Sequence, residues 1–181
     1  MKKVLLALLF ILLPFCLFAE PFGLKMGMTL DEITEASGGT KPKYRGDDSY
    51  FIYPEKKHSL FKTYVAFVDN EKGLYCIRAK TEKILLISIV ESAFTEISGR
   101  ISKTYGDPQA IDINAPGSYW EYMHWGEGSV LGGDLWAENL KDNLTCVTLY
   151  TTKSYNGEYY VILQYDFSNK KQVEDSQDMV F

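Results

Sequence analysis

The sequence has little of what metal binding and nucleophilic catalysis require. Its 181 residues include only two histidines, His58 and His124, and neither has a second histidine or a cysteine at ligand spacing. The motifs HExxH, CxxC and GxSxG are absent, as is a glycine-rich phosphate-binding loop. We therefore expect no catalytic residues, no metal ligands and no cofactor, and we interpret the chain as a non-enzymatic protein.

The chain also lacks an apolar run long enough to span a membrane. The longest run, residues 4–18, has about 15 residues, whereas a spanning helix needs roughly 20. It follows Lys2 and Lys3 and ends before Ala19, which is the layout of a secretory signal peptide. We expect cleavage of residues 1–19 and export of a mature chain, without a transmembrane segment, to the periplasm or cell envelope.

A lipoprotein signal is the alternative interpretation of this leader, because Leu13 precedes Cys16 by three residues. Such signals have a small residue immediately before the cysteine, whereas this chain has the bulky Phe15. We therefore expect no lipid attachment at Cys16.

Positive charge is in short supply. The chain has 19 Lys and Arg against 24 Asp and Glu, a net charge of −5, which falls to −7 when Lys2 and Lys3 are removed with the leader. Nucleic acids and anionic lipid surfaces attract basic proteins. We expect neither of them as a partner.

Cysteine is rare as well, since only Cys76 and Cys146 remain after cleavage. In an oxidising compartment the two can form a disulfide, which would stabilise the fold by roughly 2–4 kcal/mol. Alternatively, both are free and serve as small apolar residues of strands. The sequence leaves both possibilities open.

What the chain does have is a strongly patterned segment at residues 88–108. Ser88 and Glu91 have the spacing of a capping box, Gly106 can close a helix, and Pro108 cannot continue one. The apolar side chains between them recur every three or four residues, so that they share one face of a helix. These side chains are Val90, Ala93, Phe94, Ile97, Ile101 and Tyr105.

A second, shorter helix is predicted near the start of the mature chain. Thr29 and Glu32 form another capping box, Ile33 follows within an apolar stripe, and Gly38 and Gly39 end the segment.

The remaining segments are typical of strands, because apolar and polar residues alternate and turn residues separate them. Three runs, 49–53, 61–68 and 74–81, follow the short helix. Four more runs, 118–125, 130–137, 144–152 and 158–167, follow the long helix.

This order predicts an α+β protein made of two helix-plus-antiparallel-meander repeats, at about residues 22–82 and 84–167. We expect the two repeats to share one core as a single helix-on-sheet domain over residues 20–167. Residues 168–181 carry many charges and little periodicity, and we interpret them as a mobile tail.

Residues 22–33, FGLKMGMTLDEI, resemble the FGxxxGM(S/T)xxE opening of many uncharacterised exported bacterial proteins. They are also similar to the helix start of the BamE-like outer-membrane lipoprotein and β-lactamase-inhibitor-protein-like families, and residues 105–108, YGDP, resemble the helix end of the same group. The resemblance implies helices laid on an antiparallel sheet, often duplicated, that bind other proteins rather than catalyse. The lipoprotein families carry a clean acylation signal and the inhibitor family a disulfide in each half, and this chain departs from both patterns.

Aromatic residues are dense in the runs 118–125 and 130–137. One interpretation is that they fill the sheet core and form cross-strand pairs. The other is that some reach solvent as anchors of a binding surface, for which we select Trp120, Tyr122, Trp125 and Trp136.

The first hypothesis for function is an exported protein-interaction module of the periplasm or cell envelope that binds an envelope or secreted protein through this aromatic sheet face. The alternative is a carrier of a small apolar or sugar-like ligand. An enzyme whose site is assembled from scattered Asp, Glu and Tyr residues is the third possibility.

Overall fold

The computed structural model describes residues 20–111 and 129–178. The expected signal peptide, the expected strand at 118–125 and residues 179–181 lie outside the described residues. The described helices are η1 (Pro21–Gly23), α1 (Leu30–Ala36), α2 (Ile87–Tyr105) and α4 (Lys170–Asp178). The described strands are β1 (Lys43–Gly46), β2 (Ser49–Ile52), β3 (Phe61–Asp69), β4 (Gly73–Thr81), β5 (Gln109–Ala110), β6 (Ser129–Trp136), β7 (Leu144–Lys153) and β8 (Tyr159–Phe167).

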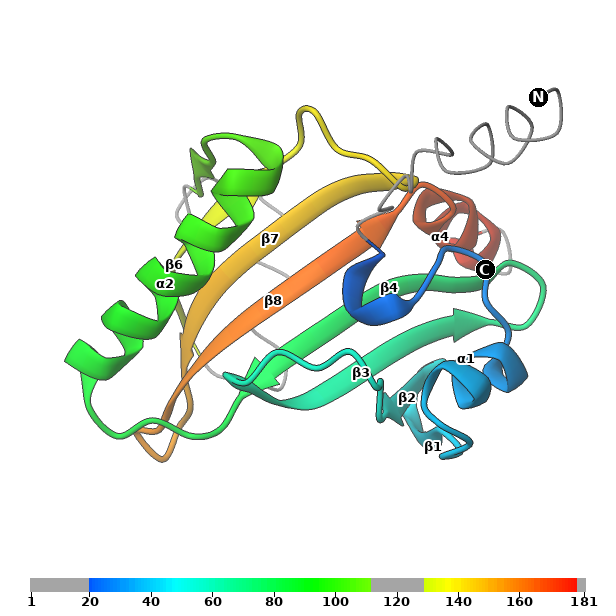
Figure 1. The fold of residues 1–181 in the computed structure, drawn as a ribbon, viewed down its shortest axis with the longest axis horizontal. Coiled ribbons are helices and arrows are strands. Elements are labelled where there is room, and N and C mark those ends of the chain that lie inside the picture. The colour runs from blue at the N-terminus through cyan, green and yellow to red at the C-terminus, as the bar shows by residue number, and fades with distance from the viewer. Residues whose placement is uncertain (1–19, 112–128, 179–181) are drawn as a thin grey trace, which may run out of the picture.

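The described strands form one eight-stranded antiparallel sheet in the order β1-β2-β3-β4-β8-β7-β6-β5. The predicted α+β class is therefore confirmed (Figure 1). Strands β2 to β4 and β6 to β8 coincide with six of the seven predicted runs. The two groups of strands are joined by the pair β4–β8, in which Ile77 lies opposite Tyr165. The sequence prediction missed the two edge strands, because β1 reads KYRG without apolar alternation and β5 has only two residues.

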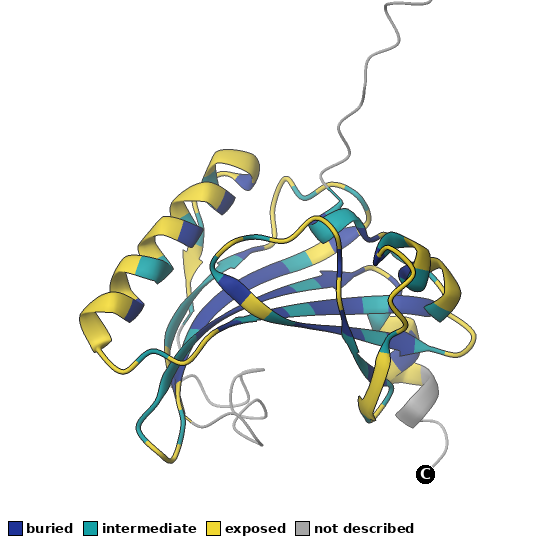
Figure 2. Cartoon of the chain, turned by 60° about the horizontal axis from the view of Figure 1, so that its bottom comes forward, coloured by how far each residue is buried: buried dark blue, intermediate teal, exposed yellow. Residues whose placement is uncertain are grey.

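The main hydrophobic core lies between α2 and one face of the sheet, which we call the helix-covered face. Helices α1 and α2 both lie on this side, whereas α4 lies on the other (Figure 2). The core joins buried side chains of α2 to buried side chains of the central strands, and its members include Val90, Ile97, Ile101, Ala66, Ile77, Val147, Leu149, Val161, Leu163 and Phe167. Burial of this stripe, at about 1.5–3 kcal/mol for each large side chain, explains why the segment is helical.

Helix α2 starts one residue before the predicted capping box. Leu86 is the N-cap and no side chain caps the first turn, so the predicted Ser88–Glu91 capping box is wrong. The start is set instead by a two-hydrogen-bond bridge in which Ile84 and Tyr159 exchange backbone N–H and C=O groups. The end is as predicted, because Gly106 closes the helix with a φ of 89° and its N–H donates to the carbonyl of Ser102.

Helix α1 begins at the predicted capping box. The N–H of Glu32 donates to Thr29 Oγ1, and the N–H of Thr29 donates to Glu32 Oε2. The preceding segment lies beside β4, where the N–H of Gly27 donates to the carbonyl of Leu74 at 2.8 Å. Gly73 opposite has a φ of 69°, and a Cβ atom there would overlap the carbonyl of Gly27, so this approach requires glycine.

The C-terminal residues differ from the expected mobile tail, because Lys170–Asp178 form the helix α4. Val173 on this helix is buried, and Asn169 immediately before it donates from Nδ2 to the carbonyls of Lys72 and Leu74. The high charge of this segment favoured a disordered interpretation. The buried side chain of Val173 and the two hydrogen bonds from Asn169 nevertheless hold the helix against β4.

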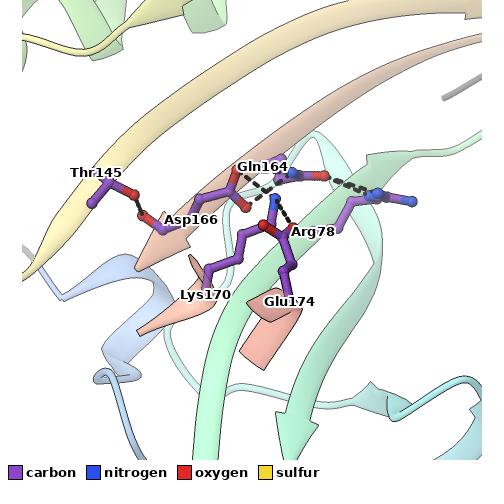
Figure 3. A network of polar contacts seen from close by, with 6 residues as sticks. All are labelled: Arg78, Thr145, Gln164, Asp166, Lys170 and Glu174. Atoms are coloured by element: carbon purple, nitrogen blue, oxygen red, sulfur yellow. Dashed lines mark hydrogen bonds and ion pairs between the residues drawn. The ribbon is translucent and has the colours of Figure 1, made fainter. Parts of the chain in front are cut away.

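A polar network on the opposite face of the sheet also holds α4 (Figure 3). Lys170 Nζ lies 2.9 Å from Asp166 Oδ2, and Gln164 Nε2 donates to the same carboxylate. Arg78 donates from Nε and Nη2 to Gln164 Oε1, and Glu174 lies 3.9 Å from Lys170. The amide of Gln164 thus donates to a carboxylate and accepts from a guanidinium, which satisfies a side chain with no exposed surface.

Both cysteines lie on this opposite face, one on each side of Asp166. Cys76 on β4 and Cys146 on β7 each pair in register with Asp166 on β8, and both thiols are free. Two strand spacings of about 4.8 Å each separate them, which exceeds the reach of a disulfide. The structure therefore has the free-thiol alternative, and the disulfide between Cys76 and Cys146 is absent.

Candidate functional site

Of the four aromatic residues selected from the sequence, only Trp136 lies within the described residues. It is 2% exposed and belongs to the main core, and its Nε1 donates to the carbonyl of Gly106 at 2.9 Å. The prediction that Trp136 is a surface contact is wrong, because the side chain ties β6 to the end of α2. Trp120, Tyr122 and Trp125 lie outside the described residues.

Among the described residues, exposed large aliphatic side chains gather at the start of α2. Leu85, Leu86, Ile87 and Ile89 are between 46% and 70% exposed, and Leu131 on β6 is 42% exposed. We call these five residues the α2-start patch. Four consecutive or nearly consecutive large aliphatic side chains in water are unusual, since most such side chains are buried. In soluble proteins a contiguous exposed apolar patch commonly marks an interaction site.

A shallow groove of about 350 Å³ connects the two parts of this patch. Ile87, Phe94 and Leu131 line it together with Gly132 and Gly133. A Cβ atom on Gly132 would meet open space, so this residue leaves room beside the strand. The hydrogen bond of 2.6 Å from Ser98 Oγ to Asp134 Oδ2 fixes α2 to β6 farther along. Ile87 and Ile89 of the patch lie on α2 and Leu131 lies on β6, two elements that are joined to each other, and Leu85 and Leu86 immediately precede α2.

A second concavity, of about 260 Å³, lies between η1 and α2 over the helix-covered face. We call it the aromatic groove. Its floor is formed by β8 and its walls by η1, the segment before β3, and α2. The side chains that the following argument uses are Phe22, His58, Phe61, Arg100, Tyr105 and Tyr165.

Phe22 is the centre of the aromatic groove. Its ring centroid lies 4.9 Å from that of Tyr64, 5.8 Å from that of Tyr165 and 6.3 Å from that of Phe61, each in an edge-to-face arrangement. Phe22 has a φ of 57°, a left-handed conformation that is rare for a bulky residue. The three ring contacts offset the strain of this backbone, which places the ring at the groove.

His58 stands at the rim of the aromatic groove and is held there by its own backbone. Tyr64 Oη accepts from the N–H of His58 at 3.0 Å and lies 3.2 Å from its carbonyl. The ring nitrogen Nδ1 accepts from the N–H of Leu60 at 3.3 Å. Nε2 lies 3.2 Å from Nη1 of Arg100, whose Nη2 donates to Glu96 Oε1 at 2.8 Å.

Three titratable side chains at the groove, His58, Tyr105 and Tyr165, favour their neutral forms. Desolvation lowers the pKa of His58, the Arg100 guanidinium lowers it further, and Glu96 opposes this shift. Burial raises the pKa of Tyr165 and of Tyr105, so that both remain phenols at neutral pH. The groove therefore presents aromatic surface, a neutral imidazole, the guanidinium of Arg100 and the side chain of Glu20.

Within residues 20–111 and 129–178, no group of His, Cys, Asp and Glu is arranged to hold a metal ion. The helices in the same described ranges are all too short or too polar to cross a membrane. Comparison of the chain with protein-family models, with curated proteins and with solved structures gives no match. The resemblance to the BamE-like and β-lactamase-inhibitor-protein-like families therefore stays a prediction.

Sequence reasoning missed both the α2-start patch and the aromatic groove. The run from Ile84 to Ile87 precedes the predicted helix, and the bridge from Ile84 to Tyr159 fixes its first residue to the sheet. The groove combines residues as distant as Phe22, His58 and Tyr165, which no local motif connects. A signal for the patch was nevertheless present, because four aliphatic residues in a row do not fit one face of a helix.

Proposed function

We propose that the protein is a non-enzymatic, exported interaction module of the periplasm or cell envelope that binds another protein through the α2-start patch. The observation that carries the proposal is the exposure of Leu85, Leu86, Ile87 and Ile89 at a fixed helix start, where Ile87 shares a groove with Leu131. The proposal moves the contact surface away from the aromatic sheet face expected from sequence, because Trp136 is buried.

The free energy of apolar burial favours a partner protein that covers the α2-start patch. Full burial of a leucine or isoleucine side chain gains about 1.5–3 kcal/mol, so a partner that covers these half-exposed side chains gains about 1 kcal/mol from each. Hot spots of protein interfaces are clusters of a few such anchors surrounded by polar residues. Lys83 and Glu91 flank the patch in sequence and are exposed, which supplies a polar rim.

We further propose that the sheet is a duplicated unit, with a helix followed by a meander in each half. The strand order supports this, because β1-β2-β3-β4 and β5-β6-β7-β8 run in opposite order from the pair β4–β8. Two such halves would present two helices on one face, as α1 and α2 do (Figure 2). Export and the absence of lipid at Cys16 remain predictions from the leader sequence.

The test uses a variant that removes the patch and favours the helix. Leu86 is the N-cap of α2 and Ile89 is three residues later, so Leu86→Asp with Ile89→Glu creates the capping pair that the helix lacks. We expect this double variant to unfold at the same temperature as the wild type or higher. We expect it to lose the partner that the wild-type protein captures from envelope extract.

The matched control is Tyr155→Asp, which removes another exposed large side chain, 91% exposed, on the loop between β7 and β8. It should leave capture unchanged. Equal capture by wild type and the double variant would refute the patch as the contact surface. Loss of a self-association, measured by sedimentation velocity, would show that the patch binds a second copy and not a different protein.

The aromatic groove favours a second candidate, the carrier of a small ligand. Native mass spectrometry after gentle purification tests this candidate, because a carrier retains a small cargo of defined mass.

A further inference from the structure

The hydrogen bonding of His58 leaves one donor at the aromatic groove without an acceptor. Nδ1 accepts from the N–H of Leu60, so the single proton of the neutral ring lies on Nε2. Nε2 lies 3.2 Å from the Arg100 guanidinium, which can only donate. In the other tautomer, Nδ1–H would face the Leu60 N–H instead. In one tautomer Nε2–H points at the Arg100 guanidinium, and in the other Nδ1–H points at the N–H of Leu60.

An oxygen with negative charge would resolve this arrangement. A carboxylate oxygen beside Nε2 and Nη1 accepts from the imidazole N–H and from the guanidinium at the same time. Two carboxylates already line or border the site. Glu96 accepts from Nη2 of Arg100, and Glu20 lines the groove but pairs with Lys25 at 3.1 Å.

Most of the rest of the aromatic groove is apolar, and Thr104 is its further polar residue. Phe22, Phe61 and Leu163 line it, and the phenols of Tyr105 and Tyr165 stay neutral. Its volume of about 260 Å³ is below the roughly 300–1,000 Å³ of sites for drug-sized molecules. The space suits one aromatic ring or a short acyl chain.

We propose that the aromatic groove binds a small carboxylic acid with an aromatic or short aliphatic body, whose carboxylate is held between His58 and Arg100. The body of the acid lies over Phe22 and Phe61. This site is separate from the α2-start patch and does not rest on the proposed function.

The experiment measures binding of phenylacetate and octanoate to the purified protein by isothermal titration calorimetry, with phenylacetamide as the neutral match of phenylacetate. We expect saturable binding of at least one acid and about tenfold weaker binding of the amide. Arg100→Gln should weaken binding of the acid about tenfold, because a charge-assisted hydrogen bond is lost. Lys103→Gln, the same change of charge on an exposed residue of the same helix, should leave binding unchanged.

Two further readouts distinguish the anion site from a structural role. Glu96→Gln should strengthen binding several-fold, since it removes a negative charge beside the ligand carboxylate. NMR titration of the His58 imidazole should show its pKa rising when phenylacetate is bound, and His124→Gln identifies the signal. Absence of saturable binding, equal binding of acid and amide, or an unchanged His58 pKa would overturn the proposal.

Discussion

Replacement of Lys170 by methionine tests the polar network that holds α4 to the sheet. The substitution keeps most of the length and the apolar stem of the side chain and removes only the ammonium group. Asp166 then retains the two hydrogen bonds from Gln164 Nε2, at 3.0 and 3.2 Å, and loses its cation at 2.9 Å.

The size of the effect follows from burial. The side chains of Lys170 and Asp166 are 15% and 9% exposed, so neither charge is well hydrated. Removing one partner of a buried ion pair costs about 3–5 kcal/mol, because the other charge stays buried without compensation. The remaining hydrogen bonds from Gln164 and the residual exposure reduce this, and we expect a loss of about 2–3 kcal/mol in the free energy of unfolding.

Urea denaturation followed by circular dichroism measures this loss. With a slope of about 1–3 kcal/mol per molar urea, Lys170→Met should lower the midpoint by about 1 M or more. The control Lys171→Met changes an exposed lysine of the same helix and should stay within about 0.5 kcal/mol of the wild type.

Asp166→Asn, alone and with Lys170→Met, completes a double-mutant cycle, in which we expect a coupling energy of about 1–2 kcal/mol. Strictly additive effects, or a Lys170→Met variant as stable as the wild type, would refute the argument that the pair holds α4.

Three other predictions follow from the fold. Thr29→Ala should cost about 1 kcal/mol in the free energy of unfolding, because it removes a formed capping box, whereas Ser88→Ala should cost less than about 0.5 kcal/mol; equal losses would contradict the assigned helix starts. Trp136→Phe should lower the free energy of unfolding by about 1–2 kcal/mol, because the hydrogen bond to Gly106 is lost, and Trp136→Ala should lower it by about 3–5 kcal/mol. A neutral effect in urea denaturation would show that the side chain is not in the core. Burial raises the pKa of Cys146 to about 12 and that of Cys76 well above its usual value, so both thiols should react with Ellman's reagent at pH 8 only after unfolding; rapid reaction of the folded protein would contradict this burial.

The parts of the fold that the sequence predicts are those with local causes. The alternation of apolar and polar residues predicted six strands. The capping box of Thr29 and Glu32 predicted the start of α1, and Gly106 predicted the end of α2, because capping depends on residues within one turn. The start of α2 escaped prediction because the bridge between Ile84 and Tyr159, 75 residues apart, sets it. A capping motif at Ser88 was available and was overridden by this tertiary contact.

The sites were harder to predict than the elements, because period-two alternation says which residues share a face but not which face is covered. On β8 Leu163 is buried on the helix-covered face, and Gln164 and Ile162 on the opposite face have no exposed surface either. Trp136 lies on a strand that was correctly located, and its burial depends on the carbonyl of Gly106, 30 residues away.

The position of β8 has a consequence for the order in which the molecule can be assembled. This strand, residues 159–167, follows the other described strands in the chain, and it lies between β4 and β7. Until it leaves the ribosome, both neighbours have an unpaired edge, and the two halves of the sheet have no hydrogen bonds to each other. The sheet therefore cannot close before residues 159–167 are available, and this strand joins both halves in a single late step.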